Sequence, residues 1–186
     1  MKKLLVVVDM QNDFVTGCLG TKEAQEIVND IKDYAESFDG DIAFTKDTHF
    51  DGYLDTQEGK KLPVVHCISG TEGWEIVPEL VTLTKTVNFN MDTQTKVNPD
   101  ERAVMTFEKV TFGSVELGEF IKRYGYEEVY LCGVCTGICV ISNAMLAKAF
   151  NPETTIRVLS KLCACVTPQS HVTALEAMKT CQIEVA

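Results

Sequence analysis

The stretch LLVVVDMQNDF, residues 4–14, decides the fold class of this 186-residue chain. Its first five residues are continuously apolar, which is typical of a strand that is covered on both faces in a parallel sheet. Asp9 follows directly, so a carboxyl group lies at the carboxyl end of the predicted strand. Because ligands of open α/β sheets bind at this edge, the stretch predicts a fold class and the position of a site.

Strands and helices alternate along the rest of the chain. Further strands are predicted at residues 41–45, 103–107, 128–134 and 155–159, with a weaker candidate at 85–89. Helices are predicted at residues 23–38, 114–125 and 136–150 and after Thr167-Pro168, and residues 48–75 form a long ordered loop. This alternation predicts a three-layer α/β fold with a mostly parallel sheet, in a single domain over residues 1–186.

Composition excludes several classes of protein. The 27 acidic and 17 basic residues give a net charge of −10, which argues against nucleic acid and anionic membranes as partners. No apolar run reaches the length of a membrane-spanning helix, about 18–20 residues. The first apolar stretch is short, β-branched and ends in Asp9, so we interpret it as a strand, not a signal peptide, and expect a cytoplasmic protein. We therefore expect the eight cysteines to be reduced thiols.

Four reactive side chains fall at or just beyond the carboxyl ends of predicted strands: Asp9, Asp47, Lys109 and Cys139. With Thr136 as N-cap, Cys139 is the third residue of a helix, where free N–H groups stabilise a thiolate. A nearby lysine should lower the thiol pKa further, and an aspartate should move the proton. This combination predicts acyl transfer through a thioester.

Four stretches in this order resemble the isochorismatase-like cysteine hydrolases, with nicotinamidase/pyrazinamidase as the nearest branch. They are VVVDMQNDF (residues 6–14), TKDTH (45–49), FEKVTFGS (107–114) and GVCTGICV (133–140). The resemblance covers essentially the whole chain. It implies a Rossmann-like fold with a six-stranded parallel sheet and an Asp–Lys–Cys catalytic triad.

Carried over residue by residue, the resemblance makes Asp9, Lys109 and Cys139 the triad. It also implies a cis peptide bond between Val134 and Cys135, and an oxyanion hole formed by the N–H groups of Cys135 and Cys139. The implied activity is hydrolysis of a small carboxamide, nicotinamide or pyrazinamide first, to the acid and ammonia. We also expect a homo-oligomer.

The same branch binds a divalent metal beside its triad. Asp47 and His49 match an Asp-x-His pair, and His66 matches a later histidine. For the fourth ligand we choose Glu58, nine residues after His49, over Asp51 and Asp55. Two imidazoles and two carboxylates suit one ion of Zn²⁺, Fe²⁺ or Mn²⁺.

Two departures from the branch concern the substrate. Gly137 stands where the branch usually has Asp, and Pro63-Val64-Val65 replaces an aromatic followed by two prolines. The missing aromatic normally stacks on the pyridine ring, so Phe14 and Leu19, with Trp74 as a further candidate, are expected to line the substrate pocket.

Alternatives come from different classes. A metal-free relative would act on another small amide or carbamoyl compound, whereas the enol-ether branch lacks the nucleophilic cysteine. Cys132-x-x-Cys135 as a redox or metal pair is disfavoured, because Cys132 falls inside a predicted strand instead of opening a helix. A catalytically silent scaffold would not need Asp9, Lys109 and Cys139 together.

Overall fold

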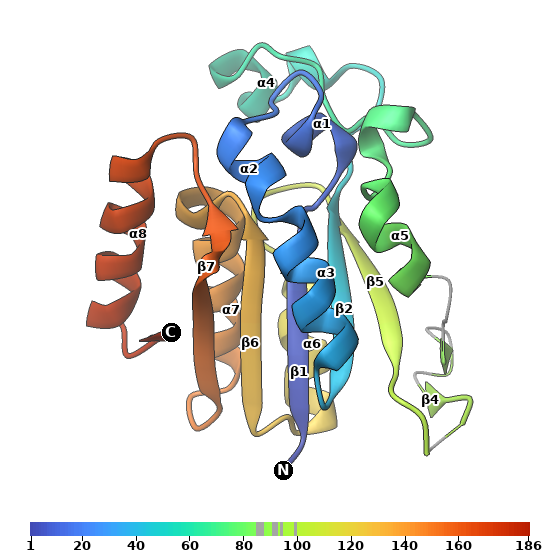
Figure 1. Ribbon diagram of the computed structural model, residues 1–186. Helices are drawn as coiled ribbons and strands as arrows, with labels where there is room; N and C mark the ends of the chain where they lie inside the picture. Colours follow the sequence, from blue (N-terminus) through green and yellow to red (C-terminus); the bar gives the residue numbers. More distant parts are fainter. Residues whose placement is uncertain (85–87, 91–92, 94, 99) are drawn as a thin grey trace.

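A six-stranded sheet, parallel throughout, forms the centre of the molecule (Figure 1). The computed structural model describes residues 1–186 except 85–87, 91–92, 94 and 99. The sheet has the order β5-β2-β1-β6-β7-β8, which confirms the predicted α/β class. Its strands are β1 (Lys3–Val8), β2 (Asp41–Asp47), β5 (Val104–Lys109), β6 (Glu128–Val134), β7 (Thr155–Ala164) and β8 (Glu184–Val185). A small antiparallel pair, β3 (Phe89–Asn90) and β4 (Thr95–Lys96), stands apart from it.

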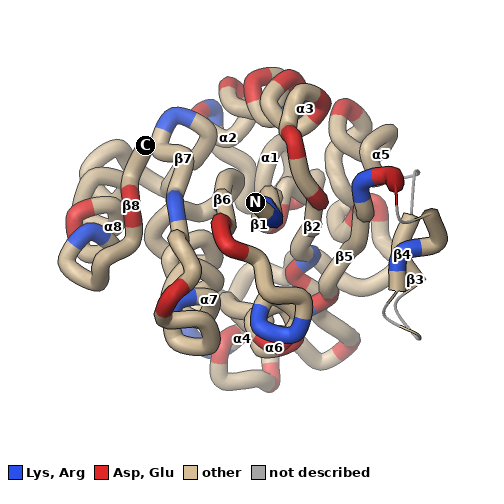
Figure 2. Tube along the Cα trace, turned by 90° about the horizontal axis from the view of Figure 1, so that it is seen from below, with Lys and Arg blue, Asp and Glu red and all other residues tan. Residues whose placement is uncertain are grey.

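Helices cover both faces of the sheet, so the three predicted layers are present. Seen along the strands, α3 and α5 lie on one side of the sheet, and α6 and α7 lie on the other (Figure 2). The longer helices are α3 (Val28–Ser37), α5 (Pro78–Thr84), α6 (Val115–Tyr124), α7 (Ile141–Phe150) and α8 (Pro168–Thr180). Within the part of the chain that the structure describes, no helix is long and apolar enough to cross a membrane.

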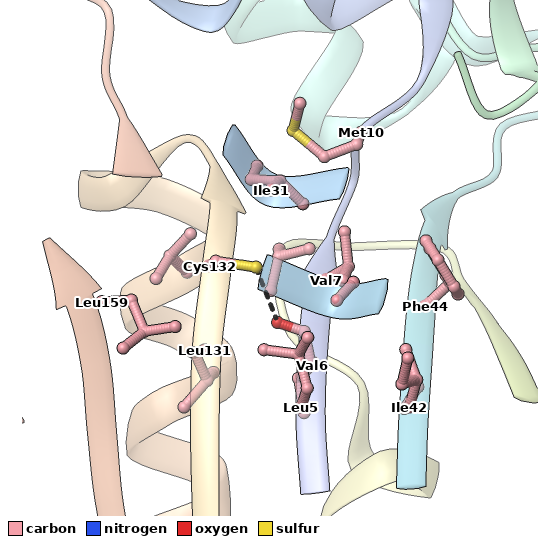
Figure 3. Close-up of a cluster of buried hydrophobic side chains, with 14 of the residues drawn as sticks. Leu5, Val6, Val7, Met10, Ile31, Ile42, Phe44, Leu131, Cys132 and Leu159 are labelled. Carbon is pink, nitrogen blue, oxygen red and sulfur yellow. Dashed lines mark hydrogen bonds between the residues drawn. The ribbon is translucent and has the colours of Figure 1, made fainter. Parts of the chain in front are cut away.

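The apolar run that opens the sequence forms the middle of the core. All five side chains from Leu4 to Val8 are fully buried, as expected for a strand covered on both faces. Side chains of β2 and β6 flank them, and Ile31 of α3 lies over them (Figure 3). Cys132 belongs to this core, where its thiol donates to the Val6 carbonyl at 3.7 Å, and burial holds its pKa well above the usual value. A buried protonated thiol of this kind does not suit a redox pair.

The predicted helix at residues 23–38 is two helices. The first, α2, covers Lys22–Glu26, and α3 covers Val28–Ser37; Ile27 is the C-cap of one and the N-cap of the other. The apolar period continues through the break because Ile27, Val28 and Ile31 are buried on the same side. Periodicity alone therefore could not reveal the interruption.

The predicted helix at residues 136–150 differs in its first turn. Residues Thr136–Val140 form a π-helical turn that precedes α7, and Cys135, not Thr136, is the N-cap. The Thr136 hydroxyl does not cap, because it donates to the Ala164 carbonyl at 3.0 Å and pairs with His171 Nδ1 at 2.8 Å. Cys139 is therefore the fourth residue of the turn, not the third.

The loop predicted at residues 48–75 is ordered around three short helices, which are η1 (Tyr53–Asp55), α4 (Gln57–Lys61) and η2 (Glu72–Trp74). A further short helix, α1 (Asn12–Val15), follows β1. Of the weak strand predicted at residues 85–89, positions 85–87 lie outside the described residues, and β3 begins at Phe89. Strand β7 continues past Leu159 to Ala164, and β8 is not among the strands predicted from the sequence.

Candidate active site

Asp9 directly follows β1 and has a conformation that is unusual for an aspartate. Its φ is 50°, in the left-handed region, and its side chain is fully buried. The Thr45 hydroxyl donates to Oδ1 at 2.6 Å, and Lys109 Nζ lies 2.7 Å from Oδ2. Among the described residues, Oδ2 accepts no hydrogen bond of ordinary geometry. This oxygen is therefore available to accept a proton.

Lys109, at the end of β5, lies between two carboxylates. Its Nζ is 2.7 Å from Asp9 Oδ2, 3.1 Å from Asp47 Oδ1 and 3.8 Å from Cys139 Sγ. Burial alone would lower the lysine pKa, but the two carboxylates and the cysteine raise it above its usual value. The ammonium group therefore stays protonated and holds the acid and the thiol in one cluster.

The Cys139 thiol is protonated in this environment. Burial and the negative charge of Asp9 raise its pKa well above the usual value, and Lys109 offsets only part of that rise. The prediction of a lowered thiol pKa is therefore wrong, because it counted the helix end and the lysine but not burial and the aspartate. A buried thiol of this kind must give up its proton as it attacks, and Asp9 is the adjacent base.

The turn around Cys139 presents backbone donors. The Val134–Cys135 peptide bond is cis, as predicted. The N–H groups of Ile138 and Val140 both donate to the Cys135 carbonyl, at 3.0 and 3.1 Å. Cys139 lies between these two residues in the π-helical turn, and in the described structure its N–H does not donate to the Cys135 carbonyl. Burial raises the pKa of the Cys135 thiol to about 12, so Cys135 can contribute its backbone N–H but not a thiolate.

Four side chains form a second cluster beside the first. Asp47, His49, Glu58 and His66 each offer a ligand atom, and these atoms all lie within 4.8 Å of one another. Asp47 Oδ2 is 3.0 Å from His49 Nε2 and 3.5 Å from His66 Nε2, and His49 Nε2 is 3.6 Å from Glu58 Oε1. Neighbouring ligands of a tetrahedral Zn²⁺ ion lie about 3.4 Å apart when the metal–ligand bonds are about 2.1 Å.

The chemistry of the donors fits a divalent cation. His66 Nδ1 donates to the Val64 carbonyl at 2.7 Å, so the lone pair of its Nε2 faces the cluster. His49 Nε2 is buried without a hydrogen-bond partner among the described residues. Burial alone would raise the pKa of Asp47, but the two adjacent histidines and the charge of Lys109 hold it well below its usual range. An ionised carboxylate and two imidazole nitrogens converge on one point.

Two residues of the opening motif, which the sequence analysis did not assign, hold the second cluster in place. The Gln11 side chain accepts from the Asp47 N–H at 2.7 Å and donates to the carbonyls of Asp47 and Trp74, both at 2.8 Å. Asp13 Oδ2 accepts from the Cys67 N–H at 2.7 Å, next to His66. The only sequence signal for these roles is that Gln11 and Asp13 follow Asp9 at every second position.

A cavity of about 270 Å³ lies between the two clusters. Its walls include the predicted residues Phe14 and Leu19, and the edge of the Phe14 ring packs against His66 with ring centroids 5.4 Å apart. Trp74 does not line this cavity, since its indole N–H donates to the Thr48 hydroxyl at 2.8 Å. The lining residues that the sequence analysis missed are Thr21, Leu62, Phe112, Val134, Ile138 and Val166. The cavity is thus apolar except at the two clusters.

Comparison with known proteins identifies the class. The family model described as the isochorismatase domain matches residues 3–186, so the chain belongs to the isochorismatase family. It is a hydrolase with the α/β fold of that family.

Three individual proteins are similar to the chain over nearly its whole length. The chain is 31% identical to the nicotinamidase/pyrazinamidase of Mycobacterium tuberculosis, with 98% of this chain and 97% of that protein aligned. The crystal structure of a pyrazinamidase/nicotinamidase from Streptococcus mutans superposes with a TM-score of 0.80 at 25% identity over the full length of both chains. A pyrazinamidase of Pyrococcus horikoshii, solved in complex with zinc, has a TM-score of 0.77 at 24% identity, with 100% of this chain and 99% of that chain covered.

Proposed function

We propose that this chain is a cysteine amidohydrolase that cleaves a small carboxamide, nicotinamide or pyrazinamide first, to the carboxylic acid and ammonia. The observation that carries the proposal is the position of the Lys109 ammonium, which contacts Asp9, Asp47 and Cys139. Two of these three partners, Asp47 and Cys139, line the cavity. The nicotinamidase/pyrazinamidase relative that aligns over nearly the whole chain supports the same reaction.

Cys139 Sγ attacks the carbonyl carbon of the amide while its proton passes to Asp9 Oδ2. The N–H groups of Cys135 and Cys139 hold the oxygen that becomes negative in the tetrahedral intermediate. Asp9 then protonates the departing ammonia, which leaves a thioester on Cys139. Water hydrolyses this thioester with Asp9 as base, and the thiol recovers its proton. Lys109 keeps Asp9 in position and balances its charge at each step.

Asp47, His49, Glu58 and His66 are proposed to hold one divalent ion, Zn²⁺, Fe²⁺ or Mn²⁺. When bound, the ion supplies an acceptor for the lone pair of a ring nitrogen. Phe14 and Leu19 contact the ring, so the amide is directed toward Cys139. The cavity is slightly smaller than the roughly 300–1,000 Å³ of pockets for drug-sized ligands, which favours a substrate with a single ring.

Ammonia release tests this function directly. The purified protein is assayed with nicotinamide, pyrazinamide, benzamide and an N-carbamoyl amino acid, before and after treatment with a chelator. We expect nicotinamide and pyrazinamide to be hydrolysed. Benzamide lacks the ring nitrogen, so its kcat/KM should be at least about 10-fold lower. Ammonia from none of these compounds would contradict the proposal. Activity on the carbamoyl compound in excess chelator would instead assign the chain to the metal-free alternative.

The single domain over residues 1–186, the cytoplasmic location and the homo-oligomer stay predictions from the sequence.

A further inference from the structure

Asn143 lies in the first turn of α7, behind the Cys139 turn, and only 2% of its surface is exposed. Its Nδ2 donates to the Cys139 carbonyl at 2.8 Å and to the Phe112 carbonyl at 3.2 Å. Its Oδ1 accepts from the Ser114 N–H at 2.9 Å. The buried amide thus makes three of the four hydrogen bonds that its atoms allow.

These three bonds join two parts of the candidate site that come from different elements. The Cys139 carbonyl belongs to the π-helical turn that carries the nucleophile. Phe112 and Ser114 belong to the segment that follows Lys109, where Phe112 lines the cavity and Ser114 caps α6 by accepting from the Leu117 N–H at 3.1 Å. Asn143 therefore links the π-helical turn that contains Cys139 to the segment that follows Lys109 in the sequence.

We infer that Asn143 is a positioning residue for the proposed reaction, because it fixes the Cys139 turn relative to Lys109 and to the Phe112 wall. No other side chain among the described residues donates to the Cys139 carbonyl. Without the amide, the turn and the wall are free to separate, and a displacement of about 1 Å between reacting groups costs a rate factor on the order of 10². The inference rests on the proposed use of Cys139 as nucleophile.

Asn151, at the end of the same helix, is a matched control. Its Nδ2 also donates to the carbonyl four residues earlier, that of Ala147 at 3.2 Å, and to a carbonyl of α6, that of Gly118 at 3.5 Å. It makes the same kind of link between α7 and α6 but lies 12 residues after Cys139, about three helical turns away. A change there tests the loss of a helix-to-helix link without a change at the nucleophile.

The experiment compares Asn143→Asp and Asn143→Ala with Asn151→Asp and Asn151→Ala. Aspartate keeps the size of asparagine and an acceptor for the Ser114 N–H, but it cannot make the two donations when ionised. For each folded variant, kcat and KM are measured with nicotinamide. Thermal unfolding and the rate of Cys139 alkylation by iodoacetamide are measured without substrate.

We expect kcat of both Asn143 variants to fall by about 10- to 100-fold while KM changes by less than about threefold, since binding groups are untouched. Alkylation of Cys139 should be at least about threefold faster, because a loosened turn exposes the thiol. Both Asn151 variants should stay within about twofold of the wild type in kcat and alkylation, whatever their unfolding temperatures.

A folded Asn143→Asp protein with wild-type kcat would overturn the inference, as would equal losses at positions 143 and 151. If neither Asn143 variant folds while both Asn151 variants do, the amide is structural and the inference is also wrong. If the wild-type protein releases no ammonia from any amide, the proposed function fails. The alkylation rates still decide the role of Asn143 in that case.

Discussion

The two ends of strand β2 each carry a buried aspartate, and the two aspartates have opposite surroundings. At the amino end, the Asp41 carboxylate accepts from the Ala103 N–H at 2.7 Å and from the Tyr126 hydroxyl at 2.9 Å, and Lys96 Nζ lies 2.8 Å away. At the carboxyl end, the Asp47 carboxylate lies 3.1 Å from Lys109 Nζ and 3.0 and 3.5 Å from the Nε2 atoms of His49 and His66. Both aspartates are 4% exposed, so burial does not distinguish them.

The two ends of the sheet differ in whether their buried polar side-chain atoms have hydrogen-bond partners. Among the described residues, His49 Nε2 is buried without a hydrogen-bond partner, and the only partner of Asp9 Oδ2 is the Lys109 ammonium 2.7 Å away; both atoms lie at the carboxyl end of the sheet. Buried polar atoms in native proteins are rarely left unpaired, so an exception indicates a missing ligand or a proton in transit. We therefore interpret the amino-end cluster as structural and the carboxyl-end clusters as functional.

The largest effect should come from the nucleophile. Cys139→Ala should reduce ammonia release by at least about 10⁴-fold, because no other group replaces the thiolate. Cys132→Ala removes a buried thiol within β6, the strand that precedes the Cys139 turn, and should leave kcat within about twofold in the folded protein. Rates of ammonia release from both variants, normalised to folded protein, decide between them. Turnover of Cys139→Ala within about tenfold of the wild type would remove the proposed mechanism.

The two ends of the sheet should differ in what they lose. Asp9→Asn should keep the fold and lower kcat by at least about 10²-fold, the usual scale for a positioned acid–base group. Asp41→Asn should lower the free energy of unfolding by roughly 1–3 kcal/mol, since it disturbs satisfied buried bonds, and leave kcat nearly unchanged. Urea unfolding and steady-state kinetics of both variants measure this contrast. Equal effects on kcat would show that the comparison has no functional meaning.

Substitutions in the proposed metal site should change the affinity for the metal ion. Glu58→Gln should weaken metal retention by about 10-fold or more and raise KM, because one carboxylate ligand becomes a neutral amide. Asp55→Asn, in the same loop, should do neither. Elemental analysis after dialysis, together with KM for nicotinamide, measures both variants. Full metal retention in Glu58→Gln would exclude Glu58 as a ligand.

The smallest effects concern the pKa of Cys139, measured as the pH dependence of its alkylation. Asp9 raises this pKa and Lys109 lowers it, so Asp9→Asn should shift the alkylation curve to lower pH and Lys109→Met to higher pH. Shifts of the same sign in both variants would show that one of the two charges does not face the thiol.

The sequence was sufficient to predict the side chains at strand ends. The buried run at residues 4–8 and the alternation of elements predict a parallel sheet, and parallel strands place Asp9, Asp47 and Lys109 at one edge. The order of the motifs adds Cys139. Glu58 was chosen by spacing alone, and the short helix α4, capped by the Thr56 hydroxyl on the Gly59 N–H at 3.0 Å, carries it to the histidines.

The supporting residues could not be predicted because their partners are backbone groups far away in the sequence. The Gln11 side chain pairs with a peptide group 36 positions away, Asp13 with one 54 positions away, and Asn143 with one 29 positions away. No local pattern encodes such contacts. The pKa of Cys139 was mispredicted for a related reason, since its burial arises only when β1, β5 and the turn after β6 meet.

The most direct test of the central claim is the identity of the residue that carries the acyl group. Wild-type protein and nicotinamide are mixed, stopped in acid during the first turnovers, and analysed by intact-mass and peptide mass spectrometry. We expect a nicotinoyl thioester on Cys139 and an unmodified thiol at each of the other seven cysteines. An acyl group on Cys132 or Cys135, or turnover that continues at the full rate after Cys139 has been alkylated, would contradict it.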